Sequence, residues 1–203
     1  MNLPTLAKEL FEIPEIVKAY HFALYKHLEV NQNRKRTNVP YIVHPVQVTM
    51  ILYTLVPDVT VNMLCASLLH DTVEDTNTTL EEITEIFGTD VAILVEMLTD
   101  VSKKEDGNRA TRKRIDMAHT ALASPQAKTI KLADTIHNSY NIGLYDKNFA
   151  PVYFAEKSEF ISVLTDGDAL LLEIAKDILS AYYEKDNIND IPSLDSIKQF
   201  LGF

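Results

Sequence analysis

The feature that most constrains the fold is residues 61–69, VNMLCASLL, which place apolar side chains on nearly every face of a helix. A helix without a polar face is stable only where other elements surround it. We therefore interpret this stretch as a central buried helix, and its spacing predicts that it belongs to a helix over residues 60–75. The remaining segments of the chain must supply its cover.

The covering segments also carry helical periodicity. From Pro14 to Leu28 the apolar residues recur at the spacing of one helix face. Thr79 and Glu82 resemble a capping box, and Gly88 suits the C-terminal cap of a helix over about 80–87. The same periodicity predicts helices over 46–55, 91–98, 111–123, 126–142, 151–163, 168–184 and 193–201.

Two polar stretches, 31–43 and 102–110, predict loops. Pro40 and Pro45 bracket the segment YIVH, for which we expect extended backbone. No repeated strand–turn–strand signal interrupts the helices. The sequence therefore predicts an all-α fold, and a length of 203 residues suits a single domain.

Composition excludes several classes of protein. The five glycines form no GxGxxG or GxxxxGK[ST] loop, which excludes a backbone cradle for phosphate. A formal net charge of −10 argues against a nucleic-acid partner or an anionic membrane surface. The single cysteine, Cys65, excludes an internal disulfide framework and a multi-cysteine zinc site, and we interpret it as an inert buried thiol. No apolar run approaches the roughly 20 residues of a membrane span, and no signal peptide is recognisable, so we expect a cytoplasmic protein.

The densest polar cluster follows the apolar stretch directly, in the sequence HDTVEDT that begins at His70. On a helix, residues four apart share a face, which pairs His70 with Glu74 and places Asp71 under Asp75. Four ionisable groups at the end of a buried helix are costly to desolvate, so a cation or a water-filled cleft is expected to receive them. The alternative is a core histidine followed by carboxylates that cap the next helix.

Two further segments carry candidate metal ligands. His44 stands in an apolar segment, and Asp134 follows an apolar pair one helical turn before Asn138. Together with His70 and Asp71 they make two imidazoles and two carboxylates, a donor set that suits Mn²⁺, Fe²⁺ or another divalent ion. Such a set leaves coordination positions for water and a phosphate oxygen, as metal-assisted hydrolysis requires. A purely structural histidine is the alternative interpretation of His44.

The complete pattern HP…HDTVEDT…KLADxxxN resembles the HD superfamily of metal-dependent phosphohydrolases. More narrowly, it is similar to the (p)ppGpp hydrolase domain of Rel/SpoT enzymes and to stand-alone small alarmone hydrolases. The resemblance runs from about Tyr20 to Asn138 and includes PYIVHP, LLHDTVEDTNTTLEEI, LTDVSK, RKRIDMA and SPQAKTIKLADTIHN. It implies one HD-type helical domain over 1–203, with a motif-bearing core at about 20–142 and C-terminal helices over 143–203.

The resemblance implies roles for the clustered acids and histidines. The positions of the family's metal ligands, for which Mn²⁺ is the usual ion, are matched by His44, His70, Asp71 and Asp134. Glu74 and Asp75 match the acidic pair that positions and activates the attacking water. The implied reaction is metal-dependent hydrolysis of a phosphate ester.

The resemblance also implies where the substrate binds. Arg34 and Lys35 match a basic pair that faces the nucleotide, and Asn138 matches an asparagine that contacts the nucleoside. The chain departs from the family at Tyr140, where arginine is usual, and at Asn141, where many members have threonine. We keep both as candidate substrate-binding residues, with base stacking as the role expected of Tyr140.

The sequence therefore predicts a pyrophosphohydrolase that removes the 3′-pyrophosphate of (p)ppGpp-like alarmones, giving GDP or GTP and pyrophosphate. The alternatives are hydrolysis of an adenine alarmone or a dNTP, and a catalytically silent nucleotide-binding module. The partner expected is a small-molecule nucleotide, while the oligomeric state is left open. Supplementary cations for the phosphates are expected among Arg36, Arg109, Arg112, Lys113 and Arg114. The acidic helices beyond residue 142 carry no motif and are interpreted as a solvated outer face.

Overall fold

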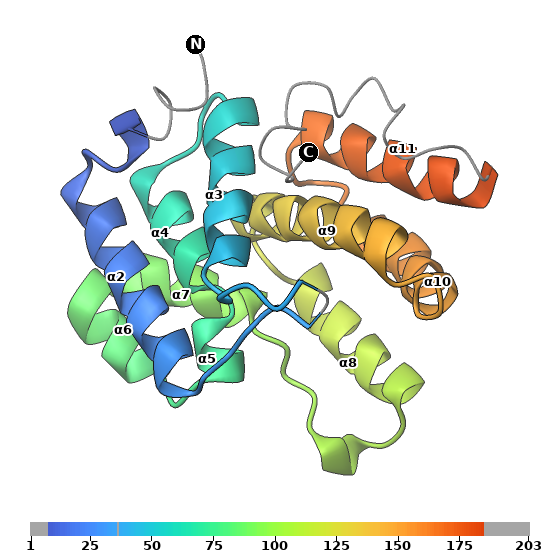
Figure 1. Cartoon of the computed structure of the whole chain (residues 1–203), viewed down its shortest axis with the longest axis horizontal. Helices are drawn as coiled ribbons and strands as arrows, with labels where there is room; N and C mark the ends of the chain where they lie inside the picture. The colour runs from blue at the N-terminus through green and yellow to red at the C-terminus, as the bar shows by residue number, and fades with distance from the viewer. Residues whose placement is uncertain (1–7, 36, 185–203) are drawn as a thin grey trace.

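The computed structural model describes residues 8–35 and 37–184, whose arrangement is shown in Figure 1. The described helices are α2 (Pro14–Glu29), α3 (Val43–Leu55), α4 (Val61–Leu69), α5 (Thr72–Asp75), α6 (Leu80–Phe87), α7 (Thr89–Leu98), α8 (Arg109–Ala121), α9 (Pro125–Tyr145), α10 (Ala150–Phe160) and α11 (Ala169–Glu184), with short 3₁₀ helices at Lys104–Asp106 and Ile161–Val163. Within these ranges there is no β-strand, so the prediction of an all-α fold is confirmed. None of the described helices is long and apolar enough to cross a membrane. The helix expected at 193–201 and Arg36 lie outside the described residues.

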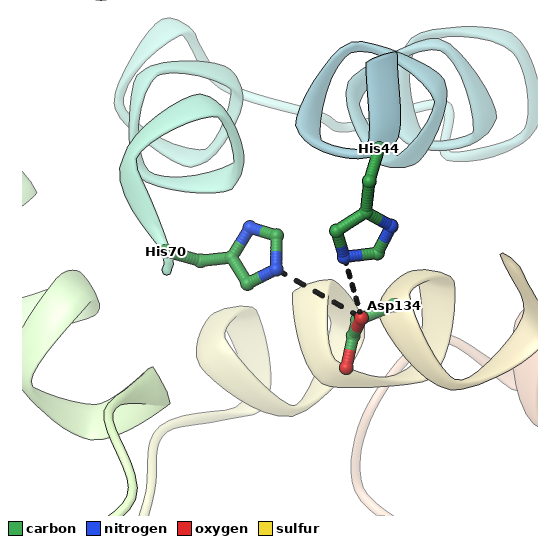
Figure 2. A group of neighbouring side chains, drawn as sticks. All are labelled: His44, His70 and Asp134. Atoms are coloured by element: carbon green, nitrogen blue, oxygen red, sulfur yellow. Dashed lines mark ion pairs between the residues drawn. The ribbon is translucent and has the colours of Figure 1, made fainter. Parts of the chain in front are cut away.

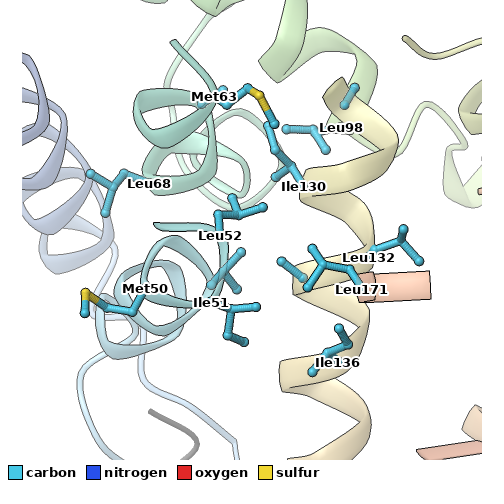
Figure 3. Close-up of a cluster of buried hydrophobic side chains, with 14 of the residues drawn as sticks. Met50, Ile51, Leu52, Met63, Leu68, Leu98, Ile130, Leu132, Ile136 and Leu171 are labelled. Atoms are coloured by element: carbon cyan, nitrogen blue, oxygen red, sulfur yellow. The ribbon is translucent and has the colours of Figure 1, made fainter. Parts of the chain in front are cut away.

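The predicted central helix is α4, in which every residue from Met63 to Leu69 is buried, Cys65 included. Helices α2, α3 and α7 pack around it. In Figure 3, Ile51 and Leu52 of α3 face α9, which contributes Ile130 and Ile136 to the same hydrophobic cluster. The cover that this apolar sequence requires is therefore supplied by helices from both earlier and later parts of the chain.

Helix α9 connects the two halves of the fold. It packs against α3, α4 and α7 on one side and against α10 and α11 on the other (Figure 1). The close approach on the α11 side depends on Gly167, because a Cβ there would lie 2.9 Å from Leu132 Cδ1 and 3.2 Å from the Leu164 carbonyl oxygen. The Asp168 amide, which also belongs to this junction, donates to Thr129 Oγ1 at 2.9 Å.

The helix predicted over 60–75 is interrupted at His70 and Asp71, which separate α4 from α5. Side chains compete for the helical carbonyl groups here: His70 Nδ1 donates to the Ser67 carbonyl oxygen at 2.8 Å, and Thr72 Oγ1 donates to that of Leu69 at 2.7 Å. Both residues at the break retain right-handed backbone angles. The prediction of one continuous helix was wrong, and the break is confined to the two residues that carry the chemistry.

The YIVH segment is not extended as predicted. The amides of Val43 and His44 donate to the carbonyl oxygens of Pro40 and Tyr41, at 3.2 and 2.9 Å, so the chain turns directly into α3. Pro45 therefore lies in the first helical turn, where a backbone N–H has no intrahelical partner and its absence has no cost. The prediction for 80–87 is confirmed, since Thr79 Oγ1 accepts from the Glu82 amide and Gly88 ends α6 with φ of 89°.

Candidate metal centre

Three separate segments bring two histidines and a carboxylate together. His44 comes from the first turn of α3, His70 from the end of α4, and Asp134 from the middle of α9. Each offers one ligand atom, and these atoms lie within 4.8 Å of one another (Figure 2). From Asp134 Oδ1, the distance is 3.1 Å to His44 Nε2 and 3.8 Å to His70 Nε2.

Asp71 adds a second carboxylate to this cluster. Its Oδ2 atom lies 3.0 Å from His70 Nε2 and 3.5 Å from His44 Nε2. The four residues that the sequence suggested as ligands therefore converge, although they span 91 positions of the chain from His44 to Asp134. The histidines are 1% and 2% exposed and the carboxylate side chains 18% and 11%, so the cluster sits at the inner end of a solvent-accessible space.

The second ring nitrogen of each histidine is fixed by a neighbour. His70 Nδ1 donates to the Ser67 carbonyl oxygen, which leaves the Nε2 lone pair facing the cluster. His44 Nδ1 lies 2.6 Å from His137 Nδ1, and burial holds the pKa of His137 well below its usual value, so this neutral ring accepts the bond. Both Nε2 atoms can then act as ligands.

The cluster has the properties of a divalent-metal site. Although Asp71 Oδ2 lies 3.0 Å from His70 Nε2, the geometry is not that of a hydrogen bond. This buried nitrogen therefore has no hydrogen-bond partner within residues 8–35 and 37–184, as expected of an atom whose natural partner is a cation. Two imidazole nitrogens with two carboxylates form a mixed donor set of the kind preferred by Mn²⁺ or Fe²⁺ rather than by thiolate-seeking metals. The residues present therefore could hold a divalent ion.

The charges in the cluster depend strongly on one another. Burial alone would lower the pKa of His70, but the adjacent Asp71 carboxylate, with Asp134, raises it to about 9. In return, and against the effect of burial, the two histidines hold the pKa values of Asp71 and Asp134 below their usual range. Both carboxylates are thus ionised at neutral pH, and a bound cation would displace the imidazole protons.

Glu74 and Asp75, the predicted acidic pair, lie on α5 just beyond the cluster. Burial, with the Asp100 and Asp71 carboxylates nearby, raises the pKa of Glu74 to about 7. Burial and Asp71 also raise the pKa of Asp75 above its usual value. Glu74 lines the same cavity as Asp71, so a carboxyl group able to take up and release a proton near neutral pH stands beside the candidate metal ligands.

Three residues that the sequence did not single out orient the acids. Tyr41 donates to Asp71 Oδ2 at 2.5 Å. Gln32 Nε2 donates to Asp75 Oδ2 at 2.7 Å, and Gln32 Oε1 accepts from His27 Nδ1 at 2.7 Å. Gln32 and Tyr41 lie within the predicted loop 31–43, and His27 lies near the end of the helix expected before it, so no motif marked their roles. They fix two carboxylates that would otherwise rotate freely.

Arg34 is connected to the candidate metal ligands through Asn138. Its Nη2 atom donates to Asn138 Oδ1 at 2.9 Å, and Asn138 Nδ2 donates to Asp134 Oδ1 at 2.6 Å. The guanidinium also lies over the ring of Tyr41, 5.6 Å from its centroid. Lys35, its predicted partner, is exposed and does not line the cavity.

The other two candidate substrate-binding residues differ in their placement. Tyr140 is only 2% exposed, belongs to the hydrophobic core and does not line the cavity. The reason is helical geometry, since two residues correspond to a rotation of about 200°, which turns Tyr140 away from the face of Asn138. Asn141 lies on α9, but its side chain is outside the described residues.

A cavity of about 420 Å³ opens beside the cluster. Its lining comes from loop 31–41, from the α4–α5 break, from α8, α9 and α10, and includes Arg34, Tyr41, Asp71, Glu74, Asp100, Arg109, Lys113, Arg114, Lys131, Asp134, Asn138, Tyr153, Glu156, Lys157 and Phe160. Arg112 lines an adjoining hollow of about 190 Å³. The prediction of a purely solvated outer face beyond residue 142 was therefore wrong for α10, which supplies one wall of this cavity.

Most cations around the cavity are held by a partner. Arg109 makes a two-pronged contact with Glu156, at 2.6 and 2.8 Å, which joins α8 to α10. Lys113 Nζ donates to Asp100 Oδ2 at 2.7 Å. Lys131 Nζ donates to the Leu98 carbonyl oxygen at 2.8 Å. The α8 cations that the sequence suggested as supplementary are thus at the cavity, together with lysines that it did not suggest.

Comparison with known proteins gives one family. A family model described as HD domain matches residues 19–150. A protein from Xenopus tropicalis named guanosine-3′,5′-bis(diphosphate) 3′-pyrophosphohydrolase MESH1 is 44% identical over 124 residues, covering 61% of this chain and 66% of that protein. The human protein of the same name is 41% identical over 128 residues, covering 63% and 69%. The chain thus matches about two thirds of the length of these relatives.

The fold also has a solved counterpart. The structure of a metazoan orthologue of SpoT that hydrolyses ppGpp is similar with a TM-score of 0.74 at 29% sequence identity. The similarity covers 83% of this chain and 95% of that one. The helical arrangement around the cluster is therefore shared with a protein of known structure.

Proposed function

We propose, from the premise that this chain belongs to the HD domain family, that it removes the 3′-pyrophosphate of (p)ppGpp-like alarmones. One water is consumed, the bond between the ribose 3′-oxygen and phosphorus breaks, and the products are GDP or GTP and pyrophosphate. The observation that carries the proposal is the convergence of His44, His70, Asp71 and Asp134 at the inner end of a cavity with cationic walls. The names of the relatives in Xenopus and human give the substrate class.

The same four residues are proposed to hold the metal, and Mn²⁺ is the ion that we propose for them. An ion at this position would supply Lewis-acid chemistry, by acidifying water and neutralising charge on a phosphate. This contribution matters because the formal net charge of the protein is −10, which by itself repels a polyphosphate substrate. The fixed Nδ1 atoms of His44 and His70 keep the coordinating faces of both rings in place.

Proton transfer is assigned to the α5 acids. Glu74, with a pKa of about 7, can accept a proton from the attacking water and release it after the P–O bond breaks. Asp75 is outside the cavity lining and is held by Gln32. We propose that it orients the water from the edge of the site through its remaining lone pairs. Arg34 and Asn138 form the nucleotide side of the site, because both line the cavity and contact each other beside Asp134.

The test is a turnover assay of the purified protein with Mn²⁺ against ppGpp, pppGpp, ppApp, a dNTP and NADPH, with the products separated by chromatography. We expect equal amounts of GDP and pyrophosphate from ppGpp, and no products after chelation of the metal. Turnover of ppApp or the dNTP alone would reassign the substrate within the same chemistry. A protein that binds Mn²⁺ and hydrolyses none of these nucleotides would instead be the silent binding module.

A further inference from the structure

Lys157 on α10 is a lysine of the cavity that the proposed reaction does not yet use. Its Nζ atom lies 4.4 Å from the ring centroid of Phe160 and 5.5 Å from that of Tyr153. All three side chains line the cavity. The ammonium group therefore lies within cation–π distance of two aromatic rings on the cavity wall.

This ammonium group differs from four other cations of the cavity, Arg34, Arg109, Lys113 and Lys131. Arg109 and Lys113 are paired with carboxylates, and Lys131 donates to a backbone carbonyl. Arg34 donates to an amide oxygen. For Lys157, no oxygen within the described residues 8–35 and 37–184 makes a hydrogen bond or an ion pair with Nζ.

An unpaired ammonium in such a place is energetically unfavourable. Burial lowers the pKa of Lys157 to about 8; the Asp134 and Asp100 carboxylates oppose this shift, and the cations Lys131 and Lys113 add to it. Contact with aromatic faces compensates only part of the lost hydration. A negatively charged group entering the cavity would supply the missing partner, and phosphate oxygens are the strongest acceptors that a nucleotide offers.

We propose that Lys157 is a substrate-binding residue whose ammonium group takes a phosphate of the bound nucleotide as its partner. This inference rests on the proposed function, because it assumes that a nucleotide polyphosphate occupies the cavity. It assigns to α10 a direct part in recognition, and it selects ligands with a phosphate over nucleosides. The phosphate concerned belongs either to the leaving pyrophosphate or to the diphosphate that the nucleotide retains, and the two products separate these sources.

The experiment measures direct binding of inorganic pyrophosphate and of GDP by calorimetry, using full-length protein as purified, with its metal content determined. The variants are Lys157→Met, which keeps the apolar stem and removes the charge, Lys157→Gln, and Lys157→Arg, which keeps the charge. Lys176→Met is the matched control, because Lys176 is an exposed lysine of α11 outside the cavity lining. ADP is measured beside GDP, so that the base preference does not affect the conclusion.

We expect Lys157→Met and Lys157→Gln to lower the affinity for pyrophosphate, for GDP or for both by about tenfold or more, the usual scale of a lost charged hydrogen bond. Lys157→Arg should restore most of the affinity, Lys176→Met should change nothing, and GDP and ADP should respond equally. Because an unpaired ammonium is unfavourable in this place, the melting temperature of Lys157→Met should be no lower than that of the wild type. Binding is measured without turnover, so a protein that fails to hydrolyse ppGpp still tests this inference. Unchanged affinity of Lys157→Met for both products, or a wild-type protein that binds neither, would overturn it.

Discussion

Two walls of the same cavity are built on different physical principles. The metal wall is defined by the four candidate ligands: Asp71 and Asp134 line the cavity. His44 and His70, which are 1% and 2% exposed, are buried behind them. The cation wall consists of Arg109, Lys113, Arg114 and Lys157 on α8 and α10, where the side chains of Arg109 and Lys113 are 47% and 42% exposed. Buried polar groups must be fully partnered, whereas exposed ion pairs exchange partners at little cost. We therefore expect chemistry to depend on the metal wall absolutely and on the cation wall by degrees.

The largest effect is expected from removal of a metal ligand. His70→Ala or Asp134→Ala should abolish Mn²⁺-dependent turnover, because each removes one of the four proposed ligands and with it the affinity for the ion. Both variants should also lose the stabilisation that a bound ion gives, about 2.7 kcal/mol at a hundredfold excess over the dissociation constant. Elemental analysis and melting temperatures with and without Mn²⁺ measure these effects.

The matched control for this prediction is His21→Ala, which removes an exposed histidine of α2. It should retain the metal content and turnover of the wild type. If His70→Ala and Asp134→Ala keep full metal content, these residues are not ligands. The expected absolute dependence of the chemistry on the metal wall would then be wrong.

A smaller effect is expected from the α5 acids, beside the metal wall. Glu74→Gln should retain Mn²⁺ while kcat falls by about 10²–10⁴-fold, the usual contribution of a general acid–base group. Asp75→Asn keeps an oxygen that can accept from Gln32, so any loss of activity should result from loss of the negative charge alone. Elemental analysis and steady-state kinetics separate metal loss from loss of chemistry, and Glu85→Gln on exposed α6 serves as the control. Loss of metal in Glu74→Gln would make this residue a ligand.

The adjacent residues Arg34 and Lys35 allow a matched comparison of substrate binding, because only Arg34 lines the cavity. Arg34→Ala should raise KM by about tenfold, because it removes a charged donor that lines the cavity and contacts Asn138. Lys35→Ala should change KM by no more than about twofold, since Lys35 is exposed outside the lining. Metal content should be unchanged in both. An equal rise of KM in the two variants would mean that Lys35 reaches the substrate.

The smallest effect is expected from pH at the cation wall. The pKa of Lys157, about 8, reflects burial first, and then Asp134 and Lys131 of α9, Lys113 of α8 and Asp100. A bound phosphate favours the charged form and raises this pKa, so the contribution of Lys157 to affinity is complete below pH 8 and is lost as the pH rises above it.

Kinetics measure this effect directly. The KM of the wild type should rise severalfold between about pH 7 and 9.5, whereas Lys157→Arg should show a flatter profile because guanidinium stays protonated. The control is again Lys176→Met, which should follow the wild-type profile. Parallel profiles for the wild type and Lys157→Arg would show that another group titrates.

The metal wall could be anticipated because its chemistry is conspicuous in local sequence. His70 and Asp71 follow an apolar stretch in which any ionisable side chain is exceptional, and Asp134 likewise follows an apolar pair. Their convergence required only that three helices pack around a common centre. The break between α4 and α5 could not be anticipated, because it results from side-chain hydrogen bonds of His70 and Thr72 that compete with an otherwise favourable helix.

Only the α8 part of the cation wall could be predicted from the sequence. The arginines and lysines of α8 stood out as a basic cluster, but their pairing with Asp100 and Glu156 did not. Lys157 stood in an acidic region without a motif, and Tyr140 was expected beside the substrate although its helix face points into the core. In both cases the amino acid was known and its surroundings were not.

By itself the sequence determined the helices, the buried position of α4, the caps of α6 and the side chains able to bind a metal. These features depend on interactions within one or two turns of chain, which periodicity and spacing record. Only the tertiary structure decided which faces share the cavity. Helices α8 and α10 line the cavity beside the candidate metal ligands because α9 packs on both sides and Gly167 allows the chain beyond α10 to approach it closely. Such contacts join residues far apart in the chain, and their geometry follows from packing the whole core, which no local pattern encodes.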